Sequence, residues 1–127
     1  MIGNIAMVAF GGALGAVLRY LSAAWIGRLA GAGFYGTLFV NVVGSFIMGL
    51  LAVMMIERFA GSWGRFAPLL LTGVLGGFTT FSAFSLDAFY LIERGRHALA
   101  AGYIGASVVF SILALLAGLT VGRTWFT

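Results

Sequence analysis

Four long apolar stretches, separated by short segments that contain arginine, cover almost the whole chain. They run over about residues 3–26, 34–56, 67–92 and 98–122. A helix needs roughly 20 consecutive apolar residues to cross the hydrocarbon core of a bilayer, and each stretch is long enough. The pattern therefore predicts an all-α integral membrane protein, with a single domain over residues 1–127 that holds four transmembrane helices.

The composition excludes a soluble protein. Hydrophobic residues make up 62% of the chain and charged residues only 8%, whereas soluble domains carry about 25% charged residues. All seven basic residues are arginines, and most lie between the apolar stretches, which favours anchors at the membrane surface over nucleic-acid binding. The first apolar stretch lacks the basic start and the cleavage site of a signal peptide, so we expect a retained span.

The arginines are balanced between the two sides of the membrane. With four spans, each side would hold three of them: Arg58, Arg65 and Arg123 on one side, and Arg28, Arg94 and Arg96 on the other. Because the bias of basic residues between loops sets orientation, this balance predicts insertion both ways and an antiparallel, dual-topology homodimer. The motifs Gly11-x-x-x-Gly15 and Gly118-x-x-x-Gly122 permit close helix contacts and fit such an assembly.

The third apolar stretch contains an anomaly at residues 73–84, which read GVLGGFTTFSAF. Glycine and threonine are poor helix formers, so we expect this helix to be broken in mid-membrane. An unwound segment from Gly76 to Thr79 would expose carbonyl oxygens, which suit a cation such as Na⁺. Phe81 and Phe84 could instead turn their electropositive ring edges toward an anion, although phenylalanines that simply face lipid or the core are the commoner case.

Polar residues recur at helical spacing in two other stretches. Thr37, Asn41 and Ser45 share one helical face, and so do Tyr103, Ser107 and Ser111. Such rows either line a polar pathway or hydrogen-bond neighbouring helices together. If they face each other, they form a narrow track of hydrogen-bond donors, which suits a small anion or a neutral polar solute.

Two charged residues lie within the apolar stretches. Arg19 either reaches to the membrane surface or provides a fixed positive charge in an anion vestibule. Asp87 is expected near the interface, paired with an arginine. The chain has no cysteine, and no nucleophile–base pair, metal-ligand cluster or phosphate-binding loop stands out. We therefore do not expect an enzyme.

Three sequence blocks resemble those of the CrcB/Fluc fluoride channels: GGALGAVLRY (residues 11–20), GTLFVNVVGSFIMG (36–49) and GVLGGFTTFSAFSLD (73–87). The resemblance implies a dual-topology antiparallel homodimer with two fluoride pores and a central, structural Na⁺ that is not transported. It implies that the carbonyls of Gly76 and Thr79 hold the Na⁺ and that Arg19 belongs to the vestibule. The implied pore residues are Thr37, Asn41, Phe81, Ser82, Phe84, Tyr103, Ser107 and Ser111.

The implied function is passive export of fluoride from the cytoplasm across a bacterial inner membrane, which relieves fluoride toxicity. A different class, the small dual-topology multidrug/proton antiporters, is also short and four-helical. Those transporters use an acidic residue in the first span, where this chain has only Arg19. A structural subunit of a larger membrane complex is the third possibility.

Overall fold

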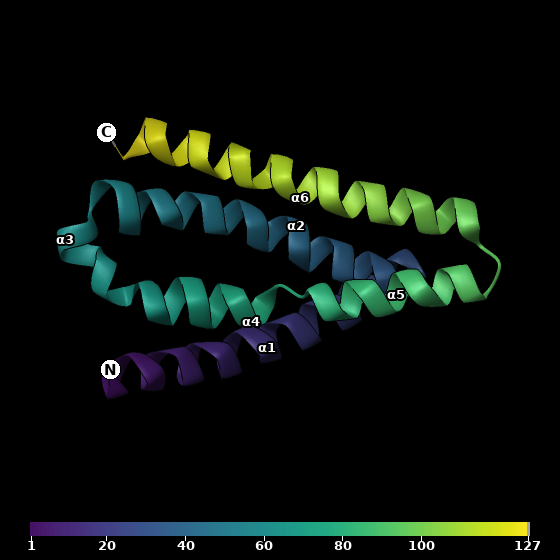
Figure 1. The fold of residues 1–127 in the computed structure, drawn as a ribbon, viewed down its shortest axis with the longest axis horizontal. Helices are drawn as coiled ribbons and strands as arrows, with labels where there is room; N and C mark the ends of the chain where they lie inside the picture. The colour runs from purple at the N-terminus through teal and green to yellow at the C-terminus, as the bar shows by residue number, and fades with distance from the viewer. Residues whose placement is uncertain (127) are drawn as a thin grey trace.

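The computed structural model describes residues 1–126, and over these residues the regular structure is entirely helical. Four helices are long and apolar enough to cross a membrane, as the sequence predicts. They run alternately up and down, so both termini lie at one end of the bundle (Figure 1). The chain is a multi-pass membrane protein.

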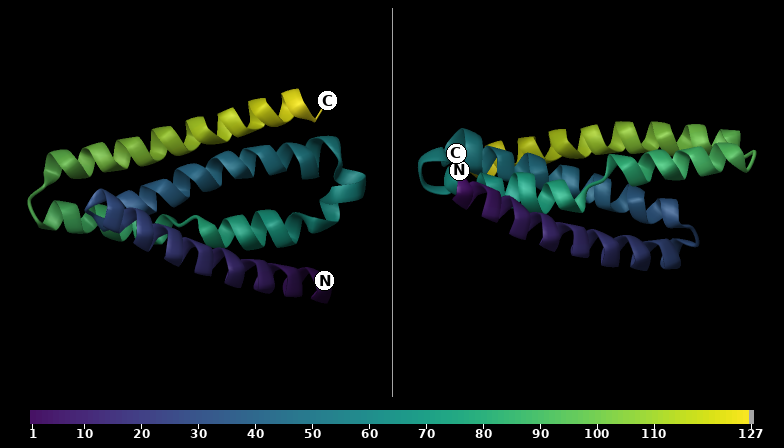
Figure 2. Two further views of the ribbon diagram at one scale, coloured as in Figure 1. Left: turned by 180° about the vertical axis from the view of Figure 1, so that it is seen from behind. Right: turned by 60° about the horizontal axis from the view of Figure 1, so that its bottom comes forward.

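The first, second and fourth spans are continuous helices. They are α1 (Ile2–Ala30), α2 (Gly33–Ala52) with its π-helical continuation η1 (Val53–Arg58), and α6 (His97–Trp125). A single turn of helix, α3 (Ala60–Trp63), and the 3₁₀ turn η2 (Gly64–Phe66) lead into the third span. At the end of the bundle that holds the α1–α2 and α5–α6 turns, α1 lies beside α2 and α5 lies beside α6 (Figure 2).

The turns at that end are short because each contains a glycine in a left-handed conformation. Gly31 has φ 89°, and its N–H donates to the carbonyl of Gly27 at 2.9 Å, which ends α1. Gly95 has φ 76° and connects α5 to α6. Only glycine adopts such angles without steric cost. Because both turns are short, the arginines beside them, Arg28, Arg94 and Arg96, lie close to the ends of the helices.

The glycine motifs join helices within one chain. Gly11 and Gly15 on α1 are buried against the backbone of the third span, next to Gly73 and Val74. Gly118 on α6 contacts the backbone of α2 in the same way. Small residues permit this close approach. Our use of these motifs as a sign of oligomerisation is therefore wrong, because sequence spacing does not tell which chain supplies the partner helix.

The third span is interrupted, as predicted, but the extended segment is shorter and lies later than the expected one from Gly76 to Thr79. It consists of π-helical η3 (Pro68–Leu75), α4 (Gly76–Phe78) and α5 (Phe81–Glu93). Thr79 and Thr80 are extended, with φ/ψ of −90°/158° and −153°/124°, and they form the thin connection between α4 and α5 in Figure 1. The expectation that the segment from Gly76 to Thr79 is unwound is thus wrong for residues 76–78, which stay helical.

Candidate functional site

Side chains from α1 and α2 satisfy the backbone at the break. Arg19 Nε donates to the carbonyl of Gly77 at 3.0 Å. Asn41 forms two bonds with Thr80: its Nδ2 donates to the carbonyl at 2.9 Å and its Oδ1 accepts from the N–H at 2.7 Å. Broken backbone at membrane depth requires such partners. The break is therefore held from two sides.

These contacts give Arg19 and Asn41 a structural role at the break. Arg19 does not stand unpaired, because its guanidinium donates to the backbone at the break; it also lines a cavity of about 300 Å³ with Thr37 and Thr80. Asn41 bonds one helix to another and, in addition, lies in the wall of the cavity described next.

A second cavity of about 300 Å³ lies between the break and α6. It brings together six of the predicted site residues. Its lining consists of Asn41, Thr79, Thr80, Phe81, Phe84, Ser107, Val108, Ser111 and Ile112. We call it the break cavity. Asn41 of the polar row on α2 and Ser107 and Ser111 of the row on α6 meet in this lining, together with the two phenylalanines of α5; the sequence left open whether the two rows face each other.

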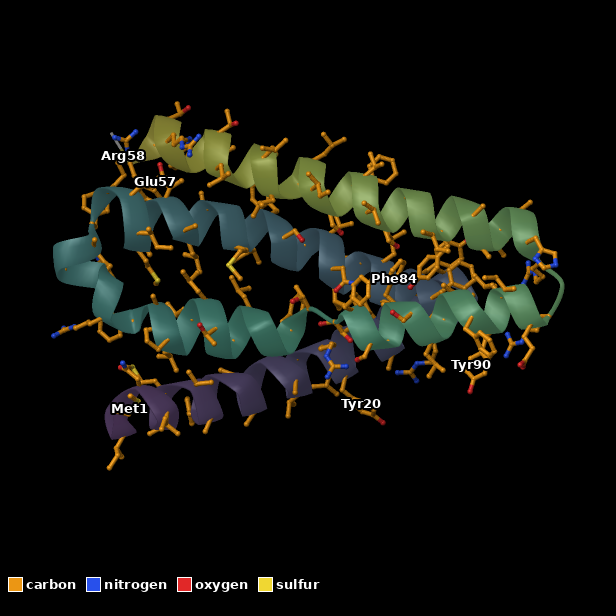
Figure 3. The ribbon with its side chains drawn as sticks, viewed as in Figure 1. Met1, Tyr20, Glu57, Arg58, Phe84 and Tyr90 are labelled. Atoms are coloured by element: carbon orange, nitrogen blue, oxygen red, sulfur yellow. The ribbon has the colours of Figure 1, made fainter. Side chains whose placement is uncertain are left out.

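The two phenylalanines occupy different environments. Phe84 is only 8% exposed and lies beside the break in the interior of the bundle (Figure 3), whereas Phe81 is 76% exposed. Their ring centroids lie 5.4 Å apart with the planes at 58°, and the Phe84 ring lies 5.3 Å from that of Tyr103. Tilted rings of this kind present edges as well as faces. Phe81 thus forms the outer rim of the cavity and Phe84 its inner wall.

Ser107 has an unusual position in this cavity. Ser107 is 6% exposed, and its Oγ, which lies near the Tyr103 hydroxyl, makes no hydrogen bond of ordinary length with any part of the chain that the structure describes. Buried hydroxyls normally have a partner, so an orphaned one calls for a functional explanation. A hydroxyl without an acceptor, at the wall of a cavity, can donate to an anion.

Besides Arg19, four predicted residues lie outside the break cavity. Ser82 is exposed and its hydroxyl lies 3.2 Å from that of Thr80. Gly76 is also exposed, one turn before the break. Thr37 and Tyr103 are buried and lie toward the other end of the rows, where both bond a carboxylate.

That carboxylate belongs to Asp87, whose role the sequence interpretation missed. Its Oδ2 accepts from Thr37 Oγ1 at 2.8 Å and from Tyr103 OH at 3.2 Å. Within the described residues it forms no ion pair, so the expected pairing with an arginine is wrong. The positions of these residues in the sequence could have revealed the contact. Thr37 and Tyr103 are the first residues of the two polar rows, and each lies at about the same depth in the bundle as Asp87 on α5.

The chain resembles proteins of known type over nearly its whole length. A family model described as CrcB-like protein, Camphor Resistance (CrcB), matches residues 6–119. A Cereibacter sphaeroides protein named fluoride-specific ion channel FluC is 54% identical over 126 residues, which are 98% of this chain and 98% of that protein. The protein of the same name from Agrobacterium fabrum is 56% identical over 124 residues, 97% of this chain and 98% of the relative.

Proposed function

We propose that this chain, which belongs to the CrcB family, conducts fluoride passively across the membrane along the cavity beside its broken third span. The observation that carries the proposal is its identity of 54% and 56%, over nearly the full length, to two proteins named fluoride-specific ion channels. Membership in the family confirms the resemblance seen in the sequence blocks. It also agrees with the expectation that the protein is not an enzyme.

The donors along the proposed path suit a small anion. Ser107 offers a buried hydroxyl without a partner, and Ser111 lies one turn further along the same face of α6. Neither carries formal charge, so an anion can bind without being held too tightly to leave, which conduction requires. Ring edges of Phe81 and Phe84 would supply further weak positive potential where water is scarce.

We propose that the functional unit is an antiparallel homodimer in which each cavity is closed by the partner copy. Phe81 is exposed at the rim of the break cavity, at the middle of the third span. In a single copy surrounded by lipid, the polar groups that line the cavity beside Phe81 would face hydrocarbon, and polar groups without partners there cost free energy. The balance of three arginines against three supports both orientations. A reporter fused to each terminus in turn tests this, and a single orientation would contradict it.

We further propose that the carbonyls of Gly76 and Thr79 hold a structural Na⁺ between the two copies. The donor chemistry fits: among the described residues no cluster of His, Cys, Asp and Glu offers a metal site, whereas carbonyls beside a helix break do bind Na⁺. The bonds from Arg19 and Asn41 go to Gly77 and Thr80, one residue beyond each proposed ligand. Such an ion would add positive charge beside the path and join the copies.

The membrane potential can drive export without a pump. Hydrogen fluoride crosses membranes as a neutral acid and loses its proton in a neutral cytoplasm, which leaves the anion trapped. A negative-inside potential drives a monovalent anion outward with about 2.3 kcal/mol per 100 mV. A passive pore in the inner membrane of a bacterial cell would therefore lower internal fluoride and relieve its toxicity.

Fluoride efflux from liposomes that contain the purified chain tests the proposal. A fluoride electrode should record rapid release once the potential is collapsed with a potassium ionophore, while chloride release under the same conditions stays at the level of empty liposomes. Equal fluxes of the two halides, or no fluoride release, would refute the channel function.

A pair of phenylalanine variants tests the position of the path. Phe81→Ile keeps an apolar side chain but removes the ring edge, so we expect at least a tenfold fall in fluoride efflux, about 1.4 kcal/mol of barrier. Phe89→Ile is the matched control, because Phe89 is an exposed residue of the same helix and lines neither cavity beside the break. Size-exclusion chromatography should give the same dimer peak for both. Equal efflux from the two variants would remove Phe81 from the path.

A further inference from the structure

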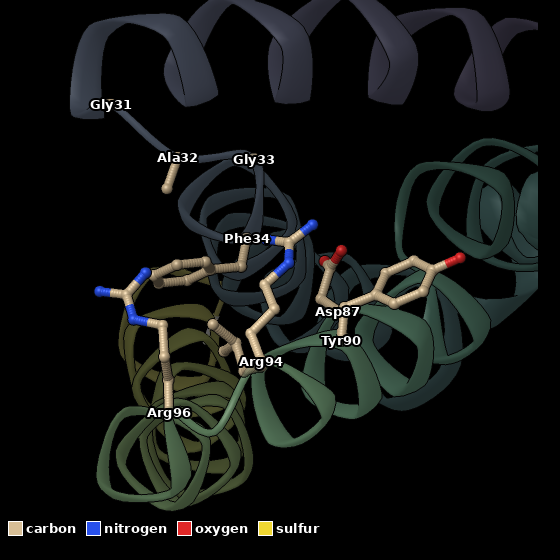
Figure 4. A pocket seen from close by; sticks show the side chains of 9 residues that line it. Gly31, Ala32, Gly33, Phe34, Asp87, Tyr90, Arg94 and Arg96 are labelled. Atoms are coloured by element: carbon tan, nitrogen blue, oxygen red, sulfur yellow. The ribbon is translucent and has the colours of Figure 1, made fainter.

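A polar pocket lies at the end of the bundle that holds the two glycine turns (Figure 4). Its volume is about 390 Å³. It is lined by the α1–α2 turn, by the last turns of α5 and by the α5–α6 turn. The residues are Gly31, Ala32, Gly33, Phe34, Asp87, Tyr90, Leu91, Arg94 and Arg96. We call it the loop pocket.

Two guanidinium groups give this pocket an excess of positive charge. Arg94 lies over the ring of Tyr90, with its Cζ 5.8 Å from the ring centroid. In Figure 4 the side chains of Arg94 and Arg96 both extend along the pocket, on either side of Phe34. Neither forms an ion pair with any residue that the structure describes. Each charge is therefore available to an anion from solution.

The other charges around the pocket do not cancel this excess. The carboxylate of Asp87 adds one formal negative charge to the lining, where it accepts hydrogen bonds from two hydroxyls, so two positive groups stand against one negative group. Glu93 and His97 flank the turn but do not line the pocket. α6 begins here, at His97, and no side chain caps its first N–H groups. The N-terminal end of a helix carries about half a positive charge and the C-terminal end about half a negative charge. The C-terminal ends of α1 and α5 lie at this pocket together with the N-terminal ends of α2 and α6, so the helix ends offset one another and the excess comes from the arginines.

The loop pocket adjoins the first member of the row of hydroxyls that the proposed function uses. Asp87 lines the pocket and bonds Tyr103, the first member of the row on α6. Ser107 and Ser111 follow at intervals of four residues on the same face, about 6 Å apart along the axis. Both line the break cavity. The bond between Asp87 and Tyr103 thus connects the lining of the loop pocket to the polar face of α6, beside the packed apolar cluster that includes Phe34, Phe84 and Leu91.

We propose that the loop pocket collects anions for the pathway, with Arg94 and Arg96 raising the local concentration of fluoride at its mouth. This inference rests on the proposed function and adds a location and a mechanism for entry. Clefts lined by one sign of charge raise local ion concentrations and entry rates by about tenfold or more, and the carboxylate of Asp87 makes the effect expected here smaller. The effect depends on salt, because the screening length falls from about 30 Å at 0.01 M to about 3 Å at 1 M.

The test compares fluoride efflux from liposomes of neutral phosphatidylcholine at low and high ionic strength. In the double variant R94Q/R96Q we expect initial efflux to fall at least threefold near 0.01 M and to match the wild type near 1 M, because screening removes the effect. The double variant R94K/R96K keeps both charges and should behave as the wild type. R65Q is the matched control, because Arg65 lies at the opposite end of the bundle over Phe66 and lines none of these cavities.

Three results would overturn the proposal. Unchanged efflux from R94Q/R96Q at low ionic strength would mean that the arginines do not recruit the ion. An equal loss at both ionic strengths would mean a structural defect. A difference seen only when anionic lipid is added would mean that the pocket binds lipid phosphate instead. Absence of fluoride efflux from the wild type would refute the proposed function itself, which is a separate outcome.

Discussion

Replacing Asn41 with alanine should destabilise the protein by disconnecting the break from α2. The side chain gives Thr80 both an acceptor at 2.7 Å and a donor at 2.9 Å. Removing it leaves one N–H and one C=O without partners at membrane depth. Each unpaired group costs about 1–3 kcal/mol. Thr80 is only partly buried, which favours the lower part of that range, and we expect a total of about 2–3 kcal/mol.

Thermal unfolding of the purified protein in detergent measures this loss. A change of 1 kcal/mol shifts Tm by roughly 4 °C for a chain of this size, so Asn41→Ala should lower Tm by about 8–12 °C. Ser45→Ala is the matched control on the same face of α2, because Ser45 lies one turn away and bonds nothing at the break. Its Tm should change by less than about 2 °C. If the two variants unfold together, the bonds to Thr80 do not hold the break.

Two further substitutions should have effects of opposite sign on stability. Ser107→Ala removes a buried hydroxyl without a partner. Tm should therefore stay the same or rise by up to about 4 °C, while fluoride efflux should fall. A drop in Tm would mean that the hydroxyl has a structural partner. Gly15→Ala places a methyl group against the carbonyl of Val74, whereas Gly12→Ala meets no atom within 4 Å. We expect the first to cost about 2 kcal/mol in unfolding measurements and the second to be neutral or stabilising; equal effects would contradict the close contact.

The sequence predicts the span number and the interruption well, because both depend on local properties. Apolar length alone identifies four spans, and the pair of threonines marks a weak point in the third. The position of the break depends on packing instead. Gly77 contacts the backbone of α1 at Gly12 and its carbonyl accepts from Arg19. These contacts offset the roughly 1 kcal/mol helix penalty of a glycine, so α4 stays helical and the chain extends two residues later.

Other features depend on contacts between distant segments and could not be read from spacing. Asp87 stands among apolar residues, and its bonds to Thr37 and Tyr103 span 50 and 16 positions of the chain. An arginine partner was the simpler expectation from composition. The glycine motifs show the same limit, because the spacing that packs α1 against η3 would equally pack two chains.

The bond between Asn41 and Thr80 constrains which replacements the chain can accept. The amide contacts the main chain of Thr80 rather than its side chain. It supplies one donor and one acceptor, as a peptide group of a neighbouring segment would. No exchange of the residue at position 80 can compensate for losing it, since every amino acid except proline presents the same N–H and C=O. The side chain of Thr80 meanwhile caps α5 by accepting from the N–H of Ala83. The requirement for an amide side chain at position 41 is therefore independent of which residue occupies position 80.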